Sequence, residues 1–96
     1  MHVIVQIPAS LRQFSDGERQ VRLDCASPST IRAVFSQLHA CHPGVVERAL
    51  DEQGQVREHV NVFVDGHSIR AGPKLGLETP VDAGAEVWIL PAVSGG

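Results

Sequence analysis

The chain has 96 residues, of which 43% are hydrophobic and 20% are charged, and these are the proportions of one ordinary globular domain. Its formal net charge of −3, without a run of Lys or Arg, argues against nucleic acid or an anionic membrane as the main partner. No apolar stretch approaches the roughly 18 residues of a membrane span and no secretory signal pattern opens the chain, so we expect a cytoplasmic protein.

The first predicted element is a β-hairpin. Residues 2–7 alternate between apolar and polar side chains, which predicts a strand. Residues 19–25 repeat this alternation, and Ser15-Asp16-Gly17 between the two segments supplies turn chemistry. We therefore expect two adjacent antiparallel strands.

The hydrophobic period then changes to that of an α-helix. Five residues fall at helical spacing: Ile31, Val34, Phe35, Leu38 and Cys41. Residues 27–29 offer caps and a first-turn proline, and Pro43-Gly44 ends the predicted helix after about four turns. Cys41 lies on the apolar stripe and is expected to be buried, and a short helical turn is expected over residues 45–50.

The second half of the chain is predicted to return to strands. Residues 59–64 form a third strand, and Asp65-Gly66 is a tight-turn signal that leads into a returning strand over residues 67–70. Residues 71–84 carry several Gly and Pro and are expected to be irregular. The last predicted strand covers residues 86–90.

This order of elements, β-β-α-β-β-β, predicts an α+β fold of the β-grasp, ubiquitin-like type. We expect a mixed sheet of four to five strands with one main helix packed on one face, and the first and last strands as parallel neighbours. The domain is expected to span residues 1–91, and residues 92–96 to form a flexible tail that leaves from the middle of the sheet.

Alternation also predicts which side chains point away from the helix. If Val3 and Val5 face the core, then an apolar set from three strands faces outward: Ile4, Phe63, Trp88 and Leu90. An exposed patch with the only tryptophan of the chain is typical of a binding surface, so we expect a docking site for a partner there. The alternative is that residues 43–58 or 71–84 cover this face.

The sequence ends on Gly95-Gly96. Because glycine has no Cβ, a terminal pair of glycines can enter a narrow activating site of another protein. The Gly96 carboxylate then becomes an acyl donor once a nucleotidyl group is attached to it. The alternative is an incidental frayed end.

Catalysis by the chain itself is not expected. His39 and His42 flank Cys41, but structural zinc needs four matched ligands, so no metal site is predicted. No phosphate-binding loop is present, and nothing in the pattern places a base beside a cysteine. The prediction is therefore a protein without catalytic residues or bound cofactor that other proteins act upon.

Three segments carry a resemblance to a known family: IPASLR at residues 7–12, VNVFVDG at residues 60–66, and DAGAEV followed by ILPAVSGG over residues 82–87 and 89–96. Together they resemble the ThiS/MoaD family of ubiquitin-like sulfur carriers, and most closely its carriers for cysteine biosynthesis. The resemblance extends over nearly the whole chain.

The resemblance implies a mechanism. An E1-like enzyme would use ATP to adenylate Gly96, and sulfur would displace AMP to leave a thiocarboxylate. A pyridoxal-phosphate-dependent cysteine synthase would then use it with O-phosphoserine, and a zinc metallopeptidase would release cysteine. In this scheme Gly95 lets the tail thread into the partner, and Val93 and Ser94 contact the partner's channel.

Other functions remain open at this point. Small subunits of molybdopterin synthase tend to carry two prolines before the final segment, whereas this chain has Pro91-Ala92, which favours the cysteine type. A ubiquitin-like modifier that is joined to lysines of other proteins would need the same terminus. A β-grasp interaction module with an incidental tail is the third possibility.

Overall fold

Five strands form one mixed sheet in the order β2-β1-β7-β4-β5. The computed structural model describes residues 1–70 and 76–91. Its sheet consists of β1 (His2–Gln6), β2 (Gln20–Asp24), β4 (Val60–Val64), β5 (His67–Ser68) and β7 (Glu86–Pro91). β7 lies in the centre, parallel to β1 and antiparallel to β4. This confirms the predicted α+β, β-grasp arrangement with the first and last strands as parallel neighbours.

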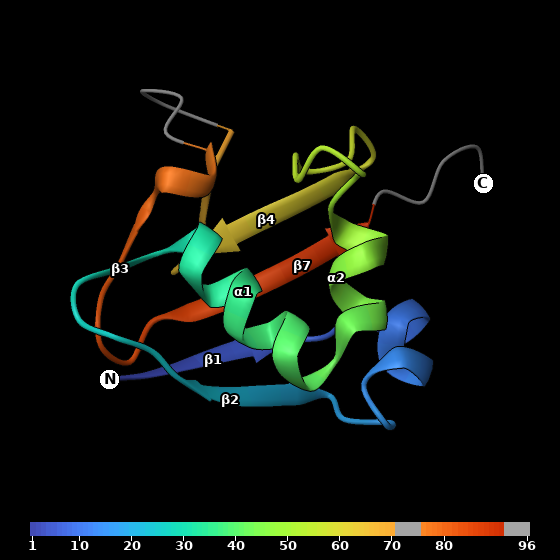
Figure 1. Cartoon of the computed structure of the whole chain (residues 1–96), viewed down its shortest axis with the longest axis horizontal. Coiled ribbons are helices and arrows are strands. Elements are labelled where there is room, and N and C mark those ends of the chain that lie inside the picture. Colours follow the sequence, from blue (N-terminus) through green and yellow to red (C-terminus); the bar gives the residue numbers. More distant parts are fainter. Residues whose placement is uncertain (71–75, 92–96) are drawn as a thin grey trace.

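Two α-helices, α1 (Ile31–Cys41) and α2 (Pro43–Ala49), pack on the same face of this sheet (Figure 1). α1 is the predicted main helix, but its eleven residues make about three turns rather than four. The predicted start is also wrong. The N-cap is Thr30, whose Oγ1 accepts a hydrogen bond from the Ala33 amide at 3.3 Å, and Pro28 lies before the cap instead of in the first turn.

α2 begins two residues earlier than expected, because Pro43 occupies its first turn, where the missing N–H of proline has no helical partner to lose. The expected burial of Cys41 is wrong, since this side chain is exposed. Cys41 is the last residue of α1, and after the turn α2 supplies Val45 and Val46 to the core in its place.

Both predicted turns of the sheet are present. The β4–β5 hairpin has a two-residue turn in which Asp65 and Gly66 adopt φ values of 48° and 86°, the left-handed region that such a turn requires. The β1–β2 connection turns at Asp16 and Gly17, as expected. It also contains a 3₁₀ helix, η1 (Ala9–Phe14), which the periodicity did not predict.

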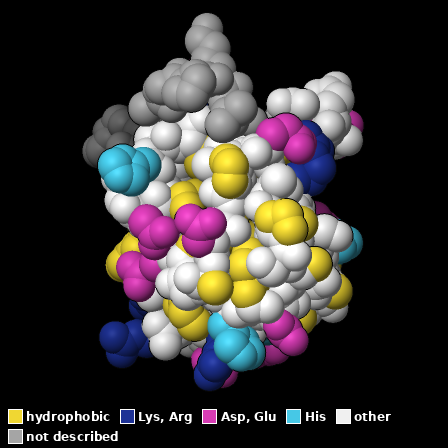
Figure 2. Space-filling view, turned by 90° about the vertical axis from the view of Figure 1, so that its left-hand side faces the viewer, with side chains coloured by type: hydrophobic (Ala, Val, Ile, Leu, Met, Phe, Trp, Pro, Cys, Tyr) yellow, Lys and Arg dark blue, Asp and Glu magenta, His cyan; other side chains and the backbone are white. Residues whose placement is uncertain are grey.

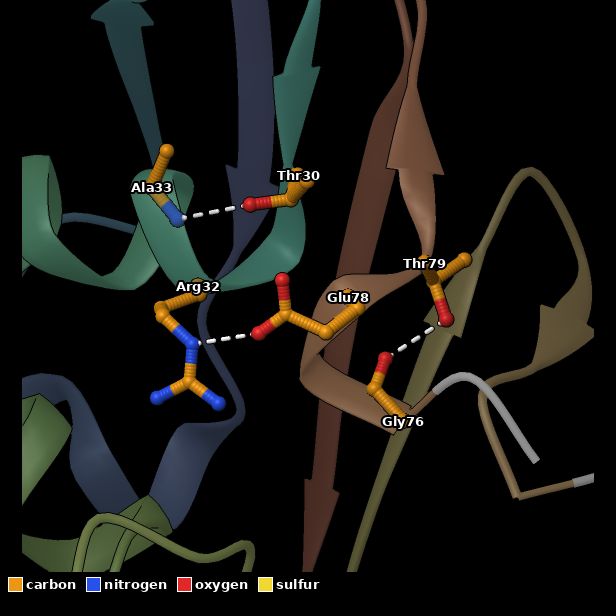
Figure 3. A network of polar contacts seen from close by, with 6 residues as sticks. All are labelled: Thr30, Arg32, Ala33, Gly76, Glu78 and Thr79. Carbon is orange, nitrogen blue, oxygen red and sulfur yellow. Dashed lines mark hydrogen bonds and ion pairs between the residues drawn. The ribbon is translucent and has the colours of Figure 1, made fainter.

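A second, two-stranded sheet was not predicted either. β3 (Ser29–Thr30) pairs with β6 (Pro80–Val81), next to the 3₁₀ helix η2 (Gly76–Glu78). Figure 3 shows how η2 is tied to the start of α1: the Arg32 guanidinium pairs with the Glu78 carboxylate at 2.5 Å. The described part of the region expected to be irregular is therefore anchored to the helix.

The core lies between the helices and one face of the sheet, and alternation along the strands places their apolar residues there. The fully buried side chains include Val3, Val5, Ile31, Val34, Leu38, Val60, Val62, Val87 and Ile89. The register brings these strand residues side by side, with Val5 paired with Val87 and Val62 with Ile89. The inward-facing half of the predicted alternation is confirmed.

α2 approaches η1 closely at Gly44. A Cβ at this position would lie 2.9 Å from Cδ1 of Phe14 and 3.0 Å from its Cβ. The same phenyl ring is covered by the Arg48 guanidinium, 4.3 Å from the ring centroid. Glycine at this position therefore serves close packing.

A Gly44→Ala substitution tests this contact. In an unobstructed helix, Ala in place of Gly stabilises by about 1 kcal/mol, but here we expect the crowded methyl group to lower the free energy of unfolding by about 1–3 kcal/mol. Urea unfolding of the single variant and of the Phe14→Ala/Gly44→Ala pair measures this effect. The added methyl should cost less once the ring is absent, because only the contact with Cβ of residue 14 remains, and an equal loss in both backgrounds would contradict the packing argument.

Candidate functional site

The face of the sheet that points away from the helices carries the four predicted patch residues, Ile4, Phe63, Trp88 and Leu90. We call these four the outer patch. Phe63 of β4 and Trp88 of β7 are paired in the sheet register. Trp88 and Leu90 are each 40% exposed, whereas Ile4 and Phe63 are half-buried. The predicted orientation of all four residues is thus confirmed.

The alternative that later segments cover this face finds no support in the described residues. α2 packs against α1 and η1, on the helical side of the sheet. η2 contacts α1, and Leu77 and Val81 contribute to the core. α2, η2 and Val81 therefore pack toward the helical side of the sheet.

The opposite end of the sheet from Pro91 has a different surface. Figure 2 shows that end with hydrophobic side chains lying among polar ones, and with acidic side chains side by side near one edge. Trp88 and Leu90, by contrast, are the large hydrophobic residues with substantial exposure among the described residues, and they lie three residues and one residue before Pro91, the last residue of β7. The exposed apolar surface therefore lies close to the point where the chain passes into residues 92–96.

β7 ends at Pro91, which is paired with Val60 at the start of β4. Two arginines hold the backbone beside this point. Arg70 donates to the carbonyl oxygens of Arg57 at 2.6 Å and Glu58 at 3.0 Å. Arg57 in turn donates from Nη2 to the Glu47 carbonyl at 3.1 Å. Arginine hydrogen bonds thus hold the backbone just before Val60, the residue that pairs with Pro91.

The sequence pattern did not single out Arg57 or Arg70, and it offers no signal for them, because their partners are backbone carbonyls brought near by the fold. The predicted tail residues Val93, Ser94, Gly95 and Gly96 lie outside the described residues. Their predicted roles stay predictions.

A groove on the helical side of the sheet is a second candidate binding surface. It lies between α1, α2 and the segment after α2, and its lining includes His39, Val46, Leu50 and Gly54. It is separated from the outer patch by the full thickness of the sheet. No predicted site residue lines it.

The two cysteines are free and differ in exposure, because Cys41 is exposed and Cys25 is buried. Burial raises the pKa of the Cys25 thiol, which disfavours its reactive thiolate form. Among residues 1–70 and 76–91, no group of three or more His, Cys, Asp or Glu side chains could hold a metal ion. In the same part of the chain, no helix combines the length and apolarity that crossing a membrane requires.

Comparisons with known proteins give one consistent result. The model of the ThiS family matches residues 5–96. Sulfur carrier protein CysO of Mycobacterium tuberculosis is 39% identical over 98 residues, and the match covers 100% of both chains. A crystal structure of the Amycolatopsis orientalis BexX/CysO complex contains a chain with a TM-score of 0.82 and 32% identity, covering 98% of this chain and 99% of that one.

A third relative comes from Haloferax volcanii. Its Small archaeal modifier protein 1 is 31% identical over 80 residues, which are 83% of this chain and 85% of the relative. The crystal structure of SAMP1 from this organism has a TM-score of 0.83 at 28% identity and covers 100% of both chains. Similar β-grasp proteins thus include both sulfur carriers and a protein named as a modifier.

Neighbouring residues on opposite faces of β7 provide a stability test of the outer patch. We expect Trp88→Ala to lower the free energy of unfolding by about 1 kcal/mol or less, since a cross-strand pair with Phe63 and an exposed hydrogen bond to Glu86 are lost. Ile89→Ala should cost about 2–5 kcal/mol, because it leaves a cavity in the core. Chemical unfolding of both variants measures the difference, and equal losses would mean that the indole is part of the packed structure.

Proposed function

Because the chain belongs to the ThiS family, we propose that this sulfur carrier protein of the CysO type holds its sulfur as a thiocarboxylate on Gly96. The observation that carries the proposal is the full-length similarity to a sulfur carrier, combined with a terminal Gly95-Gly96 that follows the central strand. The relative named CysO is a sulfur carrier protein, which supports a carrier role.

The chemistry proceeds in two steps on a partner enzyme. The Gly96 carboxylate attacks the α-phosphate of ATP, forms an acyl adenylate and releases pyrophosphate. A sulfur nucleophile then attacks the acyl carbon and displaces AMP, which leaves the thiocarboxylate. Glycine suits both steps because it has no side chain that would crowd the carbonyl carbon or widen the tail. The ATP is consumed by the partner, and this chain supplies the substrate.

The outer patch is the proposed docking surface for this E1-like activating enzyme. Trp88 and Leu90 lie on the strand that leads directly into residues 92–96, so an enzyme that covers them is positioned to receive the tail. Pro91 pairs with Val60 at the start of β4, and Arg70 holds the backbone just before Val60, so the proposed tail begins at a defined position. Val93 and Ser94 are proposed to line the path into the enzyme.

The proposed acceptor pathway is cysteine synthesis, which takes place in the cytoplasm, where ATP is available to the partner. A pyridoxal-phosphate-dependent synthase would join the thiocarboxylate sulfur to the carbon skeleton of O-phosphoserine. A zinc metallopeptidase would then cleave the cysteine from the carrier. The support is the similarity to proteins named CysO, one of which forms a complex with BexX.

Protein modification is the second candidate function, and the similarity to Small archaeal modifier protein 1 favours it. Both functions use an activated Gly96. They differ in the final acceptor, which is a lysine amine of another protein for the modifier and a small-molecule sulfur acceptor for the carrier.

The direct test is conversion of the terminus. We expect incubation with ATP, sulfide and a ThiS-family activating enzyme from the same source to exchange one oxygen of the Gly96 carboxylate for sulfur, as seen in the intact mass. Deletion of Gly96 should abolish this exchange and leave the thermal unfolding transition unchanged, because the core lies within residues 1–91.

Ser94→Ala is the matched control in the tail, and it should still be converted because the reacting carboxylate is retained. An unchanged mass of the wild-type chain with every such enzyme of its source would contradict the proposal. Covalent adducts with other proteins, isolated under denaturing conditions, would favour the modifier function instead.

A further inference from the structure

Trp88 is held by a side chain of its own strand. Its indole Nε1 donates a hydrogen bond to Oε1 of Glu86. The two residues are two positions apart in β7 and therefore project from the same face of the sheet. The other three members of the outer patch are hydrocarbon side chains, so the indole N–H is the only polar side-chain group within the patch.

Glu86 is itself fixed at the backbone. Its amide donates to Oδ1 of Asp65 at 2.9 Å, and its carbonyl accepts from the Asp65 amide at 2.9 Å. Glu86 also pairs with Ile4 of β1 and is half-buried. The carboxylate that accepts the hydrogen bond from the indole N–H thus projects from a strand held on both sides, by β1 and by the β4–β5 turn.

Two costs of docking are lowered by this contact. A side chain that is free to change rotamer loses conformational entropy when a partner covers it, whereas a side chain already held in one orientation loses less. An indole N–H that is covered without an acceptor also carries a desolvation penalty, and a charged acceptor satisfies it well. Both arguments apply to Trp88 because it is 40% exposed and therefore open to a partner.

We infer that Glu86 is a positioning residue of the docking surface, which acts through Trp88 by holding the indole in the orientation that the activating enzyme meets. This inference rests on the proposed function. The partner that fits such a surface offers an apolar pocket for an indole ring that is already held in one orientation. It needs no hydrogen-bond acceptor of its own for the indole N–H.

The test is a double-mutant cycle on ATP-dependent activation, with KM and kcat measured for the wild type, Glu86→Ala, Glu86→Gln, Trp88→Phe and Glu86→Ala/Trp88→Phe. We expect Glu86→Ala to raise KM about three- to tenfold with kcat unchanged, since one side chain must be ordered on docking. Glu86→Gln keeps an amide oxygen as acceptor and should lie closer to the wild type. In the Trp88→Phe background, which lacks the N–H, Glu86→Ala should have no further effect.

A second readout follows the indole without any partner. Because Trp88 is the only tryptophan, its fluorescence anisotropy and its quenching by acrylamide report this side chain alone. We expect Glu86→Ala to lower the anisotropy and increase the quenching, with an unchanged unfolding transition. Glu52→Ala removes an exposed carboxylate on the helical side and should change neither fluorescence nor KM.

The outcomes separate the two proposals. A wild-type chain that no activating enzyme charges contradicts the proposed function. A wild-type chain that is charged normally, with Glu86→Ala raising KM equally in both backgrounds, overturns the inference, because Glu86 would then contact the partner directly. Unchanged anisotropy in Glu86→Ala also overturns it.

Discussion

The rest of the molecule depends on β7, which both completes the sheet and the core and presents apolar side chains on the outer face. It lies between β1 and β4, so its backbone hydrogen bonds join the two halves of the sheet. Val87 and Ile89 close the core against the helices, while Trp88 and Leu90 point to the other side. Because strand side chains alternate, a single segment both stabilises the fold and presents an apolar surface.

This arrangement places the end of the described chain directly beside the core. The last described residue, Pro91, is paired with Val60, and Arg70 binds the carbonyl oxygens of the segment just before Val60. Pro91 is therefore held in the same sheet as the outer patch. Under the proposed function, an enzyme that binds the patch would therefore meet the chain that leaves Pro91 at a constant position.

Much of the fold could be predicted from the sequence, because hydrophobic residues recur at regular spacing along its strands and its main helix. Val3 and Val5 mark a half-buried strand, and Asp65-Gly66 marks a two-residue turn. The outward orientation of Trp88 follows from the same alternation. Glu86 could have been found in this way too, since it lies two residues before Trp88 on the same face.

Other features carry no periodic signal. The β3–β6 pairing joins residues about fifty positions apart through two-residue strands, and Arg70 bonds to backbone carbonyls that only the fold brings near. Periodicity alone places Cys41 in the core, because it does not indicate that this residue is the last of α1 and exposed. Local patterns thus predict elements and faces, whereas contacts between distant short segments require the structure.

The most direct test of the account is to map the partner's footprint by NMR, using the indole resonance of Trp88 and the methyl resonances of Ile4 and Leu90. On addition of the activating enzyme, the account predicts that these signals change and that those of Val46 and Leu50, in the groove on the helical side, do not. Changes confined to that groove, with the Trp88 indole unaffected, would contradict the claim that the outer face of the sheet receives the partner.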